Sequence, residues 1–140
     1  MWTQSHSKIY PNLKKEAIWR LWADVNHWSE WDKEIDYCKM EGEFVEGSQF
    51  TLKPKGGPKT KITLCKVIRN RQFTDYCKFL GAIMIDDHQL EETKQGLKIK
   101  STITMKGPLS FIWAKVVAKK VADSVPAQMD ALVELARSKM

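Results

Sequence analysis

The sequence contains no apolar run approaching the roughly 18 residues that a membrane-spanning helix requires. It also has no low-complexity tract, and its first residues lack the basic region followed by a hydrophobic region that marks a secretory signal. These absences argue against an integral membrane protein, a disordered protein and a secreted protein. We therefore expect a cytoplasmic protein without stable membrane insertion.

Cysteine is scarce, and its three positions lack the Cys-x-x-Cys spacing of zinc and redox sites. Cys38, Cys65 and Cys77 are therefore expected to be reduced thiols rather than a disulfide framework. The three histidines are equally scattered, and no glycine-rich loop follows a strand and opens a helix. The sequence thus predicts neither a metal site nor a bound cofactor.

The formal net charge of +6 comes from 23 lysines and arginines against 17 aspartates and glutamates. A basic protein suits an anionic partner. The lysines are spread along the chain, however, and none of the usual nucleic-acid recognition motifs is present. We expect no nucleic-acid binding, and these features do not define an oligomeric state.

The length of 140 residues and the hydrophobic share of 43% are sufficient for one buried core. We therefore expect a single domain over residues 1–140. Residues 2–10 predict a first strand, which stops at Pro11 because proline cannot continue the hydrogen-bonded ladder. Apolar residues at helical spacing predict a helix over residues 13–23, for which Asn12 offers an N-terminal cap.

A second short helix is predicted after Asp24, ending near Glu34. It carries Trp28 and Trp31, which are three residues apart and so share one face of a helical turn. Two indoles on one face form a large aromatic surface that must pack against something. We expect this surface to close one end of a sheet.

Short β-rich segments separated by glycine and proline run from Asp36 to about Gly107, which predicts about six strands in antiparallel hairpins. Gly107-Pro108-Leu109 then opens a C-terminal helix with an apolar residue at every third or fourth position. Pro126 lacks the N–H that the helix ladder needs, so we expect a kink at residues 123–125 or a break into two helices.

The loop at residues 94–96 predicts the register of the last hairpin. If Glu92 pairs with Leu97, His88 lies opposite Ser101 on a mostly apolar face. Asp86 lies on the same face, about 7 Å from His88 along the strand. This face is expected to point inward.

The preceding hairpin is registered in the same way, by pairing Ile68 with Phe73. Lys66 then lies opposite Asp75, and the two are expected to form an ion pair inside the sheet. Cys65 points away from the inward face in this register, so it cannot form a disulfide with Cys77.

Several short motifs recur in a particular order along nearly the whole chain. They are Asp24-Val25 before Trp28-x-x-Trp31-Asp32, Glu41-Gly42 before Glu46-Gly47, Asp87-His88-x-Leu90-Glu91, and Gly107-Pro108-Leu109 before the last helix. In this order and spacing they resemble the START-like, or helix-grip, superfamily, and within it the SRPBCC domains of the polyketide cyclase/dehydrase type. Ser29 and Leu80 depart from prolines that many relatives have at these places, which leaves the fold expectation unchanged.

The resemblance implies an α+β helix-grip fold, in which a curved antiparallel sheet of six to seven strands wraps around a long C-terminal helix. It also implies a cavity between sheet and helix that binds a small hydrophobic or amphipathic ligand, such as a lipid or polyketide. Aromatic, methionine and inward-facing polar residues are expected to line it. These ligand-binding candidates are Trp28, Trp31, Phe73, Cys77, Met84, His88, Ser101, Ile103, Met105 and Trp113.

Three functions remain open at this point. The first is binding of the ligand alone. The second is a cyclase, aromatase or dehydratase-like enzyme in which His88 is the acid or base and Asp86 or Asp75 orients the substrate. The third is a protein-interaction or regulatory domain of the same fold, with a filled interior and an exposed apolar patch. If His88 is not catalytic, it is either a core residue that hydrogen-bonds to Ser101 or to the backbone, or a residue that orients a ligand.

Overall fold

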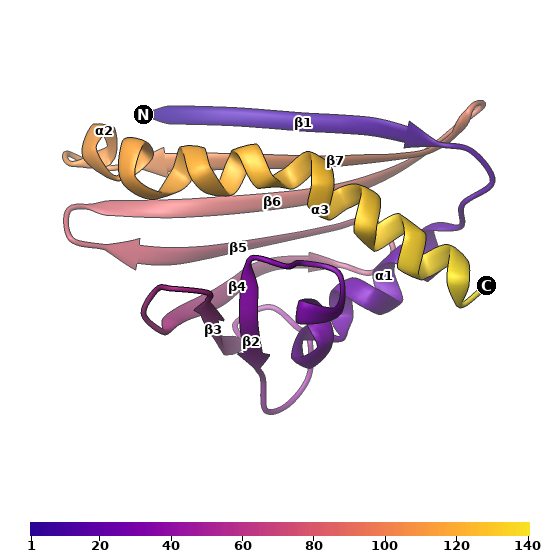
Figure 1. The fold of residues 1–140 in the computed structure, drawn as a ribbon, viewed down its shortest axis with the longest axis horizontal. Coiled ribbons are helices and arrows are strands. Elements are labelled where there is room, and N and C mark those ends of the chain that lie inside the picture. The colour runs from indigo at the N-terminus through magenta and orange to yellow at the C-terminus, as the bar shows by residue number, and fades with distance from the viewer.

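A seven-stranded antiparallel sheet forms the body of the computed structural model, which describes residues 1–140 (Figure 1). The strand order across the sheet is β1-β7-β6-β5-β4-β3-β2, so the first strand closes the edge beside the last. The strands are β1 (Trp2–Tyr10), β2 (Ile35–Lys39), β3 (Gln49–Pro54), β4 (Thr60–Ile68), β5 (Gln72–Phe79), β6 (Ala82–Thr93) and β7 (Gly96–Lys106).

All helices follow either the first or the last strand. Two short ones connect β1 to β2, and three consecutive helical segments follow β7, the last of which packs against β1, β7 and α1. Figure 1 shows this long helix lying across the sheet. The helices are α1 (Lys15–Ala23), the 3-10 helix η1 (Val25–Glu30), α2 (Ser110–Trp113), the π-helix η2 (Ala114–Ala118) and α3 (Lys119–Ser138). The predicted α+β helix-grip architecture is thereby confirmed.

The register predicted for the last hairpin is confirmed. Glu92 pairs with Leu97 and His88 pairs with Ser101, as the length of the loop requires. Because side chains alternate along a strand, this register places Asp86 and His88 on the same face of β6.

The register predicted for the β4–β5 hairpin is wrong by one residue. The hairpin turn is one residue shorter than predicted, since Ile68 pairs with Gln72 and Val67, not Ile68, pairs with Phe73. A β-bulge between Leu64 and Lys66 then shifts the pairing by one more residue, so that Leu64 pairs with Asp75. Lys66 is therefore exposed and lies opposite Thr74, which rules out the predicted ion pair with Asp75. The apolar pattern did not define the turn length, because Val67 and Ile68 are equally apolar, and no residue of the segment marked the bulge.

Local details of the helices also differ from expectation. Asn12 adopts a left-handed φ of 54° in the turn after β1, and α1 begins at Lys15 without a side-chain cap. Asn26 lies within η1, and its side-chain oxygen accepts a hydrogen bond of 2.7 Å from the Met40 amide just after β2.

The C-terminal helix is not broken at Pro126, since α3 continues through it to Ser138. Figure 1 shows its second half descending from the line of the first half, as a proline bend predicts. None of the helices combines the length and the apolar character needed to cross a membrane.

Two apolar clusters fill the space between sheet and helices. The larger one contains Trp22, Trp28 and Phe73 and gathers around α1, η1 and the second half of α3. The smaller one places three alanines of the C-terminal helical segments, Ala114, Ala118 and Ala122, against Ile103 and Met105 of β7. Small alanine side chains let the helix approach the sheet closely at this end.

Candidate functional site

A polar group of side chains interrupts the apolar inward face of the sheet. β6 supplies Asp86 and His88, and β5 supplies Asp75, which pairs directly with Asp86 across the ladder. Oδ1 of Asp86 lies 3.2 Å from Nε2 of His88. One ligand atom from each of the three residues lies within 4.8 Å of the others. The sheet thus brings together all three residues predicted as catalytic candidates, which we call the acid–histidine cluster.

Aromatic rings enclose the histidine of this cluster. The imidazole of His88 stacks on the ring of Phe73, its cross-strand neighbour, with centroids 4.0 Å apart and planes at 10°. The indole of Trp22 from α1 meets the imidazole nearly edge-on at 5.6 Å. An imidazolium held on the face of an aromatic ring is stabilised by the negative charge of the ring face.

Charge and burial together shift the pKa values of the cluster. Burial by itself lowers the pKa of His88, but the negative charges of Asp86 and Asp75 outweigh it and raise the pKa to about 9. For Asp75, burial and then the charge of Asp86 raise the pKa well above the ordinary value, against the opposing effect of His88. At neutral pH the raised pKa of His88 favours the imidazolium, while the raised pKa of Asp75 shifts its carboxyl toward the protonated form.

The hydrogen bonds of His88 agree with the imidazolium form. Nδ1 donates to the backbone oxygen of Phe73 at 3.3 Å, and Nε2 lies 3.2 Å from Oδ1 of Asp86 in an ion pair that lacks hydrogen-bond alignment. The hydrogen bond from Nδ1 to Phe73 is one that the core-histidine alternative for His88 also predicted. No hydrogen bond joins His88 to Ser101, although the two residues are cross-strand partners.

Several polar atoms of the inward face lack partners within the protein. Oδ1 of Asp86, Nε2 of His6 and Nε1 of Trp31 are buried without a hydrogen bond. The Asp75 residue is 7% exposed, and no hydrogen bond contributes to the pKa of its carboxyl group. Yet the side chains of His88 and Asp86 are 13% and 24% exposed, so solvent reaches the cluster from one side.

A fourth acid near the cluster was not predicted. Asp32, the residue after Trp31, is buried, and burial raises its pKa while Gln128 and the backbone of Glu34 oppose the rise by hydrogen bonding. Gln128 of α3 donates to Asp32 at 2.8 Å, which ties the helix to the end of η1. The only signal in the sequence was the position of Asp32 within the Trp-x-x-Trp-Asp motif.

The predicted ligand-binding residues divide between the two apolar clusters. Trp28, Trp31, Phe73 and Cys77 belong to the larger one, where the indoles of Trp28 and Trp31 lie 5.8 Å apart. Ile103 and Met105 belong to the smaller one, with the partly buried Met84 and Trp113 packed against it. Ser101 is buried, while His88 lies with the acid–histidine cluster. The residues therefore form two apolar walls on either side of a polar centre.

The acid–histidine cluster offers two carboxylates and an imidazole, which are ligands that divalent transition metals accept. Metal binding requires the neutral imidazole. The pKa of His88, raised to about 9, opposes this form at neutral pH, and the imidazolium already supplies a positive charge beside Asp86.

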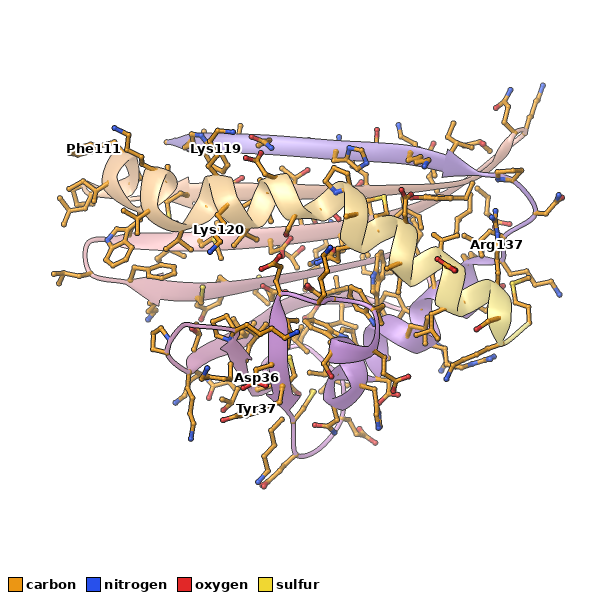
Figure 2. The ribbon with its side chains drawn as sticks, viewed as in Figure 1. Asp36, Tyr37, Phe111, Lys119, Lys120 and Arg137 are labelled. Carbon is orange, nitrogen blue, oxygen red and sulfur yellow. The ribbon has the colours of Figure 1, made fainter.

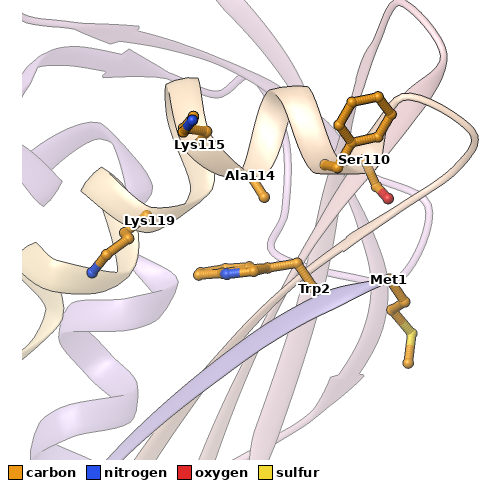
Figure 3. A pocket seen from close by; sticks show the side chains of 7 residues that line it. Met1, Trp2, Ser110, Ala114, Lys115 and Lys119 are labelled. Carbon is orange, nitrogen blue, oxygen red and sulfur yellow. The ribbon is translucent and has the colours of Figure 1, made fainter.

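Two hollows of the surface lie away from the cluster. One, of about 350 Å³, is lined by Met1, Trp2, Ser110, Phe111, Ala114, Lys115 and Lys119. Figure 3 shows Trp2 reaching from β1 toward the turn of helix that carries Ala114. The other, of about 460 Å³, lies beside β1 and α3 and contains the carboxylate of Asp130, which accepts hydrogen bonds from Tyr10 and Lys8.

No protein-family model and no curated protein sequence matches this chain. Solved structures do. The hypothetical protein jhp0584 from Helicobacter pylori has a TM-score of 0.78 and 14% identity, with 96% of this chain and 88% of that one covered. Ara h 8.0201 has a TM-score of 0.75 and 12% identity, with 98% of each chain covered.

A third similar structure is norcoclaurine synthase from Thalictrum flavum, in complex with dopamine and hydroxybenzaldehyde. Its TM-score is 0.72 at 14% identity, and the match covers 99% of this chain and 89% of that one. At these identities the likeness shows the fold alone. The fold expected from the resemblance to START-like proteins is confirmed by it.

Proposed function

We propose that this helix-grip protein binds a small amphipathic ligand between the sheet and the C-terminal helix. The ligand places a hydrogen-bond donor, such as a hydroxyl or an amine, on Asp86 of the acid–histidine cluster. Its apolar body lies against the aromatic wall of Phe73 and Trp22 on one side or against Met84 on the other.

The observation that carries this proposal is the set of inward polar groups without protein partners. Oδ1 of Asp86 lies 3.2 Å from His88 but accepts no hydrogen bond within the protein, and a buried acceptor without one costs about 1–3 kcal/mol. Natural cores seldom retain such atoms, and a binding site is a common reason for those that remain. The exposure of the Asp86 side chain supports a path by which a ligand reaches it.

The structural neighbours supply a further, weaker argument. Norcoclaurine synthase from Thalictrum flavum was crystallised with two small aromatic molecules, dopamine and hydroxybenzaldehyde. Both combine an apolar ring with polar groups at its edge. The aromatic enclosure of His88 suits a ligand of this general kind.

Binding can be tested with three probes that share one alkyl chain but differ in head group: dodecylamine, dodecanol and dodecanoate. We expect the amine and the alcohol to quench the tryptophan fluorescence, because Trp22 borders the cluster, and dodecanoate to bind more weakly because it lacks a donor. Asp86→Ala should weaken binding of the amine by about tenfold to a hundredfold, since a hydrogen bond to a charged group is lost.

The matched control for this experiment is Asp87→Ala. Asp87 is the next residue but points to the other face, where Thr74 and Gln89 hydrogen-bond to it. Affinity of this variant for dodecylamine should stay within about twofold of the native value. Binding of none of the probes, or an equal loss in the two variants, would contradict the proposal.

A second candidate function is acid–base catalysis of the cyclase or dehydratase type. It is favoured by one observation, the convergence of His88, Asp86 and Asp75 within 4.8 Å of one another. With its pKa near 9, His88 would act as a general acid that protonates a carbonyl or a leaving hydroxyl, and Asp86 would accept the proton removed from the neighbouring carbon of the substrate.

This enzymatic alternative makes its own prediction for His88→Gln. Turnover of a poly-β-ketone substrate should fall by about a hundredfold or more, because glutamine cannot donate a proton to the reacting group. Binding of the same substrate should persist. If turnover is absent from the native protein, or survives unchanged in the variant, His88 is not a catalytic acid.

A further inference from the structure

The exposed side of the helical turns after β7 combines large apolar side chains with lysines. Bulky apolar residues and basic residues alternate there at helical spacing, and no acidic residue intervenes before Asp123. Phe111 is 70% exposed, although phenylalanine normally favours the interior. We call this surface the tip face; its exposed members are Phe111, Ile112, Lys115, Val116, Lys119 and Lys120.

The turn between β5 and β6 extends this apolar surface. Leu80 at that turn is 80% exposed, and its backbone oxygen accepts a hydrogen bond of 2.8 Å from the indole of Trp113. Met1 borders the same region, since it lines one hollow together with Phe111. With Ile83, which pairs with Lys78 just after this turn, six of the eleven exposed large hydrophobic residues therefore lie at this end of the molecule, which isolated surface residues do not explain.

The charge of the tip face is positive. Lys119 forms an ion pair of 3.0 Å with Asp123, whereas no carboxylate lies within ion-pair distance of Lys115 or Lys120. Lys78 and Lys106, at the ends of β5 and β7 nearby, also have no ion pair. Figure 2 shows Phe111, Lys119 and Lys120 on the first turns of the C-terminal helical segments.

We infer that the tip face docks this protein on the surface of an anionic phospholipid bilayer. A helix face with aromatic and aliphatic side chains among lysines matches the requirements of the interface, where apolar groups enter the acyl boundary and ammonium groups meet phosphates. A second copy of the chain suits this face less well, since it would oppose lysine to lysine. Docking is peripheral, because no helix of the protein is suited to cross the bilayer.

The hollow lined by Met1, Trp2 and Phe111 is a place at the tip face where part of a lipid could bind. It is lined by the rings of Trp2 and Phe111 and by the lysines Lys115 and Lys119. Figure 3 shows Trp2 on β1 and the two lysines on the helical segments across from it. Tryptophan is favoured at the depth of lipid head groups, where one end of the ring is apolar and the other is wet. This arrangement fits a phosphate against the lysines with the start of an acyl chain beside the rings.

The inference is tested by co-sedimentation of the full chain with phosphatidylcholine vesicles, with and without phosphatidylserine. We expect binding to the anionic vesicles only, and a loss of binding as salt is raised. Lys115→Glu/Lys120→Glu should reduce the partition coefficient at least about twentyfold, because each lysine contributes about fivefold. Phe111→Ser/Ile112→Ser should reduce it at least about tenfold, because their side chains no longer enter the acyl boundary.

The matched control is Lys59→Glu/Lys61→Glu, which changes the net charge equally at exposed positions near the start of β4. It should bind anionic vesicles within about threefold of the native protein. An equal loss in both charge variants would show that only net charge matters, and would overturn the inference. Equal binding to neutral and anionic vesicles, or no binding to either, would also overturn the inference. So would self-association of the protein that the Phe111→Ser/Ile112→Ser variant abolishes.

Discussion

Replacing Phe73 with alanine is expected to lower the free energy of unfolding by about 3–5 kcal/mol. The ring is almost completely buried on β5 and lies at the centre of the larger apolar cluster. Its centroid is 5.1 Å from that of Trp22 and 5.2 Å from that of Phe44, and both contacts are edge-to-face. Alanine would leave a cavity that these rigid rings cannot close.

Urea denaturation followed by tryptophan fluorescence measures this loss, with the slope of the transition unchanged if only stability is affected. Phe111→Ala makes the same chemical change at an exposed position and should alter stability by no more than about 0.5 kcal/mol. A loss below about 1 kcal/mol for Phe73→Ala would contradict the central position of this ring.

The second large effect is a loss of stability as the pH rises. The pKa of His88 is about 9 in the folded protein, above its ordinary value of 6.5. A raised pKa means that the folded state holds the proton more tightly, so this contribution is complete below pH 6.5 and is lost as the pH passes about 9. The full effect is at most about 3 kcal/mol.

Other titratable groups with raised pKa values, Asp75, Cys38 and Cys77, also make the protein less stable as the pH rises, the two cysteines only at higher pH than His88. The pKa of Asp75 is also raised, mainly by burial, so its contribution likewise decreases with rising pH. Burial, followed by nearby carboxylates, raises the pKa of Cys38 and Cys77 to about 12, so these thiols affect stability only at more alkaline pH.

Equilibrium unfolding at a series of pH values from 6.5 to 9 provides the measurement. In His88→Gln the slope over this range should largely disappear, because the titrating group is absent. His27→Gln is the control: His27 is exposed and pairs with Asp24 at the surface, so the slope of that variant should resemble the native one. A native protein with equal stability at both ends of the range would refute the prediction.

The two hairpins show how far the sequence could specify strand pairing. In β6–β7 a short loop and an uninterrupted alternation left one register, so the position of His88 opposite Ser101 could be predicted. In β4–β5 the same reasoning failed, because the adjacent apolar residues Val67 and Ile68 allow two turn lengths and the bulge after Leu64 has no compositional signature. Asp75 was correctly placed on the inward face, but its neighbour is Asp86 rather than Lys66.

The sequence predicted which residues of the sheet form the candidate site, but not the contacts between them. His88, Asp86 and Asp75 were identified as titratable residues of the inward face. The distance of 3.2 Å between His88 and Asp86 was not expected from a separation of two residues along a strand. Asp32 and Trp22 were not predicted at the site because they approach it from η1 and α1, whose placement on the sheet depends on packing.

The sequence by itself determined the order of the elements, the inward face of the last hairpin and the apolar stripe of the C-terminal helix. These follow from periodicity and turn residues, which act over a few positions of the chain. The tertiary structure alone decided which charges meet. It set Asp86 between His88 and Asp75, enclosed His88 with rings from two other elements, and gathered Leu80 and Met1 beside the tip face. Such contacts join residues far apart in sequence, and no local pattern encodes their distance.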